Sequence, residues 1–242
     1  MIISFYVLVF LVAGMVKGLL GMGLPTVAVG LLALAITPAE ASALLLIPSL
    51  VTNLWQMFNG PALTQIIKRL WLMMAAVCLG TLITTQWLVS SGSNIIPALL
   101  GLILMAYGCI GLLSYRLPKA SAHPIVSASI GLITGLITGA TGVFVLPAVP
   151  YLQALNLGKE ELIQALGLSF TVSTLALGVG LYWQGGLEVI NVKESCLMLI
   201  PALVGLGIGQ WIRTRLSEAL FRRVFFVGLL VLGFCSSIRA IV

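Results

Sequence analysis

Eight long apolar runs, separated by short polar links, make up most of the chain, and glycine clusters interrupt two of them. About 20 consecutive apolar residues are enough for a helix to cross the hydrocarbon core of a bilayer. The pattern therefore predicts an all-α polytopic membrane protein. The expected membrane segments are 2–36, 40–58, 70–90 and 95–115 in the first half and 125–157, 161–183, 196–212 and 220–241 in the second.

Composition supports this fold class. Of 242 residues, 60% are hydrophobic and only 7% are charged, whereas a soluble domain carries about 25% charged residues. The net charge of +6 comes from lysines and arginines in the links, a pattern that reports membrane orientation rather than nucleic-acid binding. The N-terminal run has no basic region before it and no small-residue cleavage site, so we expect it to be retained as a membrane segment.

The two sets of four runs resemble each other, which predicts an internal duplication with repeats at 1–118 and 119–242. The join is expected near "YRLPKASAHP" (115–124). The matched segments are "GMVKGLLGMG" (14–23) with "GLITGLITGATG" (131–142), "PSLVTN" (48–53) with "LSFTVS" (168–173), and "LGTLITTQW" (79–87) with "LVGLGIGQW" (203–211).

Charge predicts that the repeats are inverted. The second link of the first copy carries Lys68 and Arg69, whereas its counterpart around Glu188 is net negative. The next link is uncharged in the first copy and arginine-rich at 213–223 in the second. Because positively charged links face the cytoplasm, equivalent links should lie on opposite sides of the inner membrane. The N-terminus is then outside, with the links at Lys68–Arg69, 116–123 and 213–223 in the cytoplasm.

Inversion requires an odd number of crossings per repeat, although each repeat has four runs. The first run of each repeat is therefore expected to enter and leave on the same side. A straight helix over 2–36 would be about 52 Å long, so two half-helices or two short crossings fit better. We expect each repeat to be a broken, re-entrant-type hairpin followed by three full transmembrane helices.

The broken hairpins suggest a substrate site near the middle of the membrane, where unwound backbone is tolerated if it lines a cavity. In the first hairpin Lys17 precedes Gly21 and Gly23, and Pro25 suits the first turn of a returning helix. The second returning helix is expected to begin near Thr141–Gly142. Helix starts present free N–H groups, which bind anions. Both tips are therefore candidates for an anion site.

Polar residues at helical spacing mark the run after each hairpin: Ser49, Asn53 and Gln56 in the first copy, Ser169 and Ser173 in the second. Such a stripe either forms hydrogen bonds between helices or binds a polar substrate. The full set of expected substrate-binding residues is Lys17, Gly21, Gly23, Asn53, Gln56, Thr138, Thr141, Gly142, Ser169 and Ser173.

Two of these assignments have structural alternatives. Glycines at four-residue spacing, such as Gly14 and Gly18 or Gly131, Gly135 and Gly139, allow close helix packing without any role in binding. The side chain of Lys17 could instead extend to the membrane interface if its helix is short or tilted.

The Gly-xxx-Gly start, the glycine-rich break and the following proline occur together in "GLITGLITGATGVFVLPAVPYL" (131–152), followed by "LGKEELIQALGLSFTVST" (157–174). These motifs resemble those of the TauE/SafE sulfite exporter family, and the resemblance extends through both repeats. It implies transport of small sulfur-containing anions such as sulfite, sulfonates or sulfoacetate.

The acidic residues narrow the mechanism. The chain has no aspartate, and its six acids are glutamates near the ends of apolar runs, whereas a proton or sodium relay usually has a carboxylate within a span. An exported monovalent anion gains about 2.3 kcal/mol per 100 mV in a negative-inside cell. We therefore expect a uniporter or weakly coupled carrier that exports the anion by alternating access. The glutamates are Glu40, Glu160, Glu161, Glu188, Glu194 and Glu218.

Other functions remain open from the sequence. A permease for sulfonate or organic-acid uptake would have the same features, and so would a non-transporting membrane scaffold. An integral-membrane enzyme is disfavoured because the chain has neither HExxH nor GxSxG and only one histidine. We expect no catalytic residues, metal or cofactor, and no nucleic-acid partner. The expected partners are the bilayer and a small anion, and a homodimer is left open.

Overall fold

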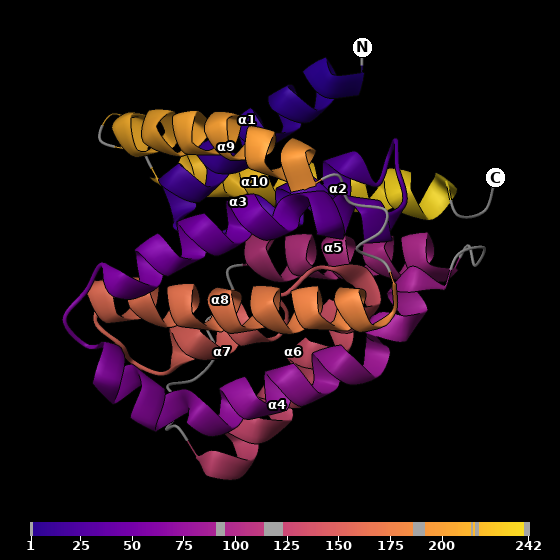
Figure 1. Cartoon of the computed structure of the whole chain (residues 1–242). Coiled ribbons are helices and arrows are strands. Elements are labelled where there is room, and N and C mark those ends of the chain that lie inside the picture. Colours follow the sequence, from indigo (N-terminus) through magenta and orange to yellow (C-terminus); the bar gives the residue numbers. More distant parts are fainter. Residues whose placement is uncertain are drawn as a thin grey trace. The chain divides into compact units, whose positions relative to one another are not determined.

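The computed structural model describes residues 2–90, 95–113, 123–185, 192–213, 215 and 218–239, and the regular elements within these ranges are all helices (Figure 1). Eight of the helices are long and apolar enough to cross a membrane. The prediction of an all-α polytopic membrane protein is confirmed. The helices are α1 (Ile2–Leu20), α2 (Leu24–Leu32), α3 (Pro38–Phe58), α4 (Leu63–Val89), α5 (Ile95–Leu112), α6 (Pro124–Thr141), α7 (Ala148–Ala154), α8 (Lys159–Trp183), α9 (Val192–Arg213) and α10 (Glu218–Arg239).

Both glycine-interrupted runs are broken into a long and a short helix. α1 has 19 residues and α2 has nine, while α6 has 18 and α7 has seven. At 1.5 Å per residue, nine residues extend only about 14 Å, roughly half of the hydrocarbon core. Each hairpin thus combines one arm of spanning length with one short arm.

The chain forms two compact units. Unit 1 contains Met1–Pro48, Ser90–Tyr115 and Glu188–Val242, and unit 2 contains Ser49–Val89 and Arg116–Leu187. Both units therefore combine segments from the two halves of the sequence. The boundary after Pro48 falls inside α3, whose two parts belong to different units. The predicted join at 115–124 lies mostly outside the described residues.

The main helix pairs within each unit also combine the two halves. In unit 1, α1 packs against α9 and α5 against α10; in unit 2, α4 packs against α6 and α8. If α1 corresponds to α6 and α4 to α9, the α1–α9 and α6–α4 pairs are equivalent. An internal duplication would produce such reciprocal pairs. The duplication and the inverted orientation of its copies stay predictions.

Glycines allow the backbones of these pairs to approach closely. Gly14 and Gly18 of α1 lie directly against the backbone of α9, and Gly205 and Gly209 of α9 lie against the backbone of α1. In unit 2, the glycines of α6 have the same role against α4; they are Gly131, Gly135 and Gly139. The packing interpretation is confirmed for these glycines.

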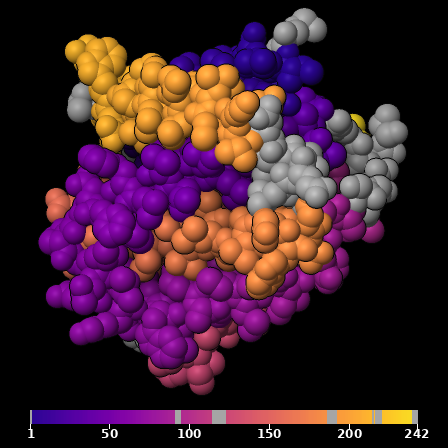
Figure 2. All heavy atoms as spheres, viewed as in Figure 1, coloured from indigo at the N-terminus to yellow at the C-terminus, as the bar shows by residue number. Residues whose placement is uncertain are grey.

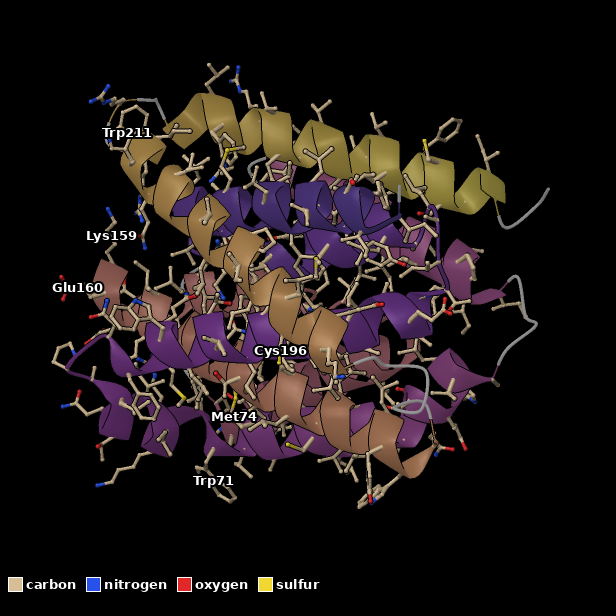
Figure 3. The ribbon with its side chains drawn as sticks, turned by 45° about the horizontal axis from the view of Figure 1, so that its top comes forward. Trp71, Met74, Lys159, Glu160, Cys196 and Trp211 are labelled. Atoms are coloured by element: carbon tan, nitrogen blue, oxygen red, sulfur yellow. The ribbon has the colours of Figure 1, made fainter. Side chains whose placement is uncertain are left out.

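Large apolar side chains cover the outward faces of the helices, as expected for surfaces in contact with lipid. Leu197, Ile200 and Val204 are 47%, 62% and 50% exposed on α9, whose atoms form the upper orange band in Figure 2. On α4, Trp71 is 58% exposed and points away from its unit, whereas Met74 is 8% exposed and points inward (Figure 3).

A proline inside α3 changes the hydrogen bonding of this helix just before the unit boundary. Pro48 has no N–H to donate to the carbonyl of Leu44, four residues earlier. The hydroxyl of Ser195 on α9 donates a hydrogen bond of 2.8 Å to this carbonyl. Ser195 is buried, so an α9 side chain replaces the helix bond that Pro48 cannot make.

The replacement of Ser195 by alanine should test this compensation. We expect Ser195→Ala to lower the free energy of unfolding by about 1–2 kcal/mol, because the buried Leu44 carbonyl loses its donor. The effect should shrink by at least half in a Pro48→Ala background, where residue 48 can donate to Leu44. A double-mutant cycle by reversible unfolding in detergent measures the coupling. Equal costs in both backgrounds would contradict the compensation.

Candidate functional site

The first break separates α1 from α2 over Gly21–Gly23. The N–H of Gly21 donates to the carbonyl of Lys17 at 2.7 Å, and the φ angles of Gly21 and Gly23 are 73° and 99°. These left-handed conformations favour glycine, which lacks a Cβ. α2 then begins at Leu24, with Pro25 in its first turn as predicted. The first turn of α2 therefore presents backbone N–H groups to the break.

Two polar side chains flank this break within unit 1. Lys17, one turn before Gly21, is only 3% exposed. Its side chain is therefore enclosed by protein. Thr26, in the first turn of α2, is fully buried, and its hydroxyl has no hydrogen-bond partner among the described residues. The first break thus combines a buried lysine, a helix start and a hydroxyl without a partner among the described residues.

The second break has the opposite polarity from the one predicted. α6 ends at Thr141, and Gly142 caps it with a φ of 74° and an N–H bond of 2.8 Å to the carbonyl of Thr138. The next helix begins only at Ala148. The prediction that a returning helix starts near Thr141–Gly142 is wrong. This position is a helix C-terminus, which presents carbonyl groups rather than N–H groups.

The threonines of the second break direct their hydroxyl protons into α6. Thr138 and Thr141 each donate a hydrogen bond of 2.7 Å, to the carbonyls of Thr134 and Ile137. The oxygen of Thr141 also accepts a hydrogen bond of 3.3 Å from the N–H of Val143. A hydroxyl has only one proton, so in this arrangement both threonines bond to their own helix and have no proton left for an anion.

The second part of α3 runs antiparallel to α8 within unit 2. The amide of Gln56 donates to the carbonyl of Ile163 at 2.9 Å, and the amide of Gln164 donates to the carbonyl of Met57 at 2.8 Å. Nearer the middle of α8, Ser49 contacts Thr174. Residue numbers thus fall along α3 as they rise along α8. In this arrangement Gln56 fixes the two helices together.

A directed chain of hydrogen bonds connects α3 to α8 at Ser49. The hydroxyl of Thr174 donates to the carbonyl of Phe170 at 2.7 Å, so its only proton is used. Ser49 must therefore donate in its 3.1 Å contact with Thr174, and the Asn53 amide donates to Ser49 at 3.0 Å. The predicted polar stripe does form hydrogen bonds between helices at Ser49 and Gln56, whereas Asn53 donates to Ser49 within α3.

Ser169 and Ser173 lie outside this chain. Both are fully buried, one turn apart on α8, and their hydroxyls have no hydrogen-bond partner among the described residues. Thr171, on the same helix, instead donates to the carbonyl four residues earlier, at 2.7 Å. A buried polar group without a partner costs about 1–3 kcal/mol. Two adjacent examples on one helix face make Ser169 and Ser173 candidates for ligand binding.

The second break lies against this part of α8. The rings of Phe144, two residues after Gly142, and Phe170, next to Ser169, are 5.6 Å apart. Both rings are almost completely buried. The end of α6 and the unsatisfied serines of α8 therefore belong to one region of unit 2.

The expected site residues divide between the two units. Unit 1 holds Lys17, Gly21 and Gly23, and unit 2 holds Asn53, Gln56, Thr138, Thr141, Gly142, Ser169 and Ser173. Sequence reasoning missed four further buried hydroxyls that lack a partner among the described residues. One of them, Thr26, could have been found from the sequence, because it directly follows Pro25 at the predicted helix start. They are Thr26 and Ser42, together with Thr81 and Ser236.

Comparison with known proteins identifies a family. The family model described as "Sulfite exporter TauE/SafE" matches residues 6–235. No curated protein and no solved structure matched the chain.

Proposed function

Since this chain belongs to the TauE/SafE sulfite exporter family, and is therefore a multi-pass membrane transporter, we propose that it exports a small sulfur-containing anion. The anion is sulfite or an organosulfonate, and the carrier works by alternating access without a strongly coupled ion. This proposal assigns roles in substrate binding separately to the residues around each helix break, one in each unit.

The observation that carries the proposal is the pair of unsatisfied hydroxyls on α8. Ser169 and Ser173 are fully buried and lack partners among the described residues. A sulfonate or sulfite ion has several strong acceptor oxygens and no hydrogen-bond donor of its own. Each serine can give its one proton to such an oxygen, and a hydrogen bond to a charged group contributes about 1.5–3 kcal/mol.

The residues at the first break also favour a negatively charged substrate. Lys17 is buried, and the start of α2 presents N–H groups with the positive end of its helix dipole. Thr26 adds a hydroxyl without a partner among the described residues. We propose that Lys17 and this helix start attract the anion. Thr138, Thr141 and Gly142 are proposed to shape the second break rather than to donate hydrogen bonds.

Export needs no coupling ion on energetic grounds. A monovalent anion leaving a negative-inside cell gains about 2.3 kcal/mol per 100 mV. No glutamate is buried among the residues whose burial is described, which supports a carrier without a carboxylate relay. The orientation with the N-terminus outside remains part of the proposal, and a homodimer is left open.

Flux measurements with the purified protein in liposomes test this function. We expect sulfite and methanesulfonate to cross in response to an imposed membrane potential, in the direction that the potential favours, because the transported species carries net charge. Protein-free liposomes are the control. Flux that requires a proton gradient and ignores voltage would contradict uncoupled export.

The alternatives predict different results in the same assay. An uptake permease would accumulate a sulfonate or organic acid against the potential when a second gradient is supplied. A membrane scaffold would show no flux of any anion, although the protein is folded. Voltage-driven flux of sulfur oxyanions separates the proposed exporter from both.

A further inference from the structure

The buried charges limit the charge of the substrate. Lys17 is the only charged side chain that is buried among the residues whose burial is described. The described glutamates lie in the first turns of helices and are exposed or half-exposed: Glu40 on α3, Glu160 and Glu161 on α8, and Glu194 on α9. The described part of the interior thus holds one lysine and no buried carboxylate.

The polar groups proposed to bind the substrate are otherwise neutral. In unit 2, the buried polar side chains among the described residues are hydroxyls and amides. Such groups orient an anion and satisfy its lone pairs, but they do not neutralise its charge. The free energy of transferring an ion out of water rises with the square of its charge, so an uncompensated second charge is much more costly than the first.

From this charge balance we propose that the protein transports its substrate as a monoanion and rejects dianions of similar shape. The inference rests on the proposed function and specifies the substrate class of that site. It holds whether or not Lys17 contacts the anion. Among the neutral hydroxyls and amides of unit 2, a monoanion leaves one negative charge uncompensated and a dianion leaves two.

The charge rule divides the candidate substrates. Simple sulfonates carry one charge over the physiological pH range, and hydrogen sulfite also carries one. Sulfate, fully ionised sulfite and sulfoacetate carry two. We therefore assign sulfonates and hydrogen sulfite as substrates, and we expect sulfate and sulfoacetate to be poor ones.

Methanesulfonate and sulfate form a matched pair for the test, because both are tetrahedral about sulfur and differ mainly in charge. In proteoliposomes at equal driving force, we expect methanesulfonate flux to exceed sulfate flux at least about tenfold. This ratio corresponds to a free-energy difference of about 1.4 kcal/mol between the two anions. Sulfite flux should fall as pH rises and converts hydrogen sulfite into the dianion. Methanesulfonate flux over the same pH range is the control for effects on the protein.

The outcomes separate this inference from the proposed function. Sulfate flux equal to or above methanesulfonate flux would overturn the monoanion rule while leaving anion transport in place. The absence of flux for every anion would overturn the proposed function and the inference with it.

A charge variant provides an independent measurement. Ser173→Lys would add a cation among the buried neutral groups of unit 2, and it should raise sulfate flux relative to methanesulfonate at least several-fold. Ser173→Met, with a neutral side chain of comparable length, is the matched control. An unchanged ratio in a folded Ser173→Lys protein would contradict the rule, and the wild-type comparison decides the question if this variant does not fold.

Discussion

Replacement of Gly205 by leucine is expected to abolish the folded protein. A Cβ atom at this position would meet the carbonyl of Leu11 and the backbone of Met15 on α1. Backbone cannot move aside as a flexible side chain can, so the two helices would have to separate. Overpacking in a tight core typically costs about 1–3 kcal/mol, and a backbone clash with a whole leucine should exceed this range. Expression and size-exclusion profiles in detergent would measure the loss.

Gly207 provides the matched control on the same helix. It lies two residues from Gly205 and is exposed, and a Cβ atom added there would meet no atom within 4 Å among the described residues. Gly207→Leu should therefore leave folding intact and raise stability slightly, because glycine lowers helix stability by up to about 1 kcal/mol. Similar damage from both variants would show that the added side chain itself, rather than the α1–α9 contact, decides the result.

Hydropathy predicted the long helices well because lipid requires apolar side chains along a whole span. The first break was also predictable, since Gly21 and Gly23 weaken a helix and Pro25 favours a new start. The second was misassigned although the sequence contains the signal. A glycine after a helical run, here Gly142, is typical of a helix end. Pro147 then disfavours helical conformation at the residue before it.

The interleaving of the two halves could not be read from the sequence. Small residues at four-residue spacing, as in Gly14 and Gly18, indicate that a helix packs closely, but they do not identify its partner. The partner is set by tertiary contacts, here between α1 and α9. For the same reason, the sequence revealed the polar stripes but not which hydroxyls are satisfied. Ser49 has a partner on α8, whereas Ser169 has none among the described residues.

This difference between satisfied and unsatisfied hydroxyls leads to the most discriminating prediction, a combined Ser169→Ala and Ser173→Ala variant. Removal of two buried hydroxyls that lack partners among the described residues should raise the free energy of unfolding by about 1 kcal/mol each, because their desolvation cost disappears. Transport should fall, with KM for methanesulfonate raised roughly 100-fold, since each lost hydrogen bond to a charged oxygen costs about 1.5 kcal/mol or more.

The control for this variant is Thr171→Val on the same helix. The Thr171 hydroxyl already donates to the carbonyl of Gly167, so its loss should leave KM unchanged and alter stability only slightly. Thermal unfolding in detergent and flux in proteoliposomes measure the two effects separately. A double serine variant that is less stable than the wild type but transports normally would assign Ser169 and Ser173 to packing. Greater stability together with weaker transport is the combination expected only if these hydroxyls are kept for the anion.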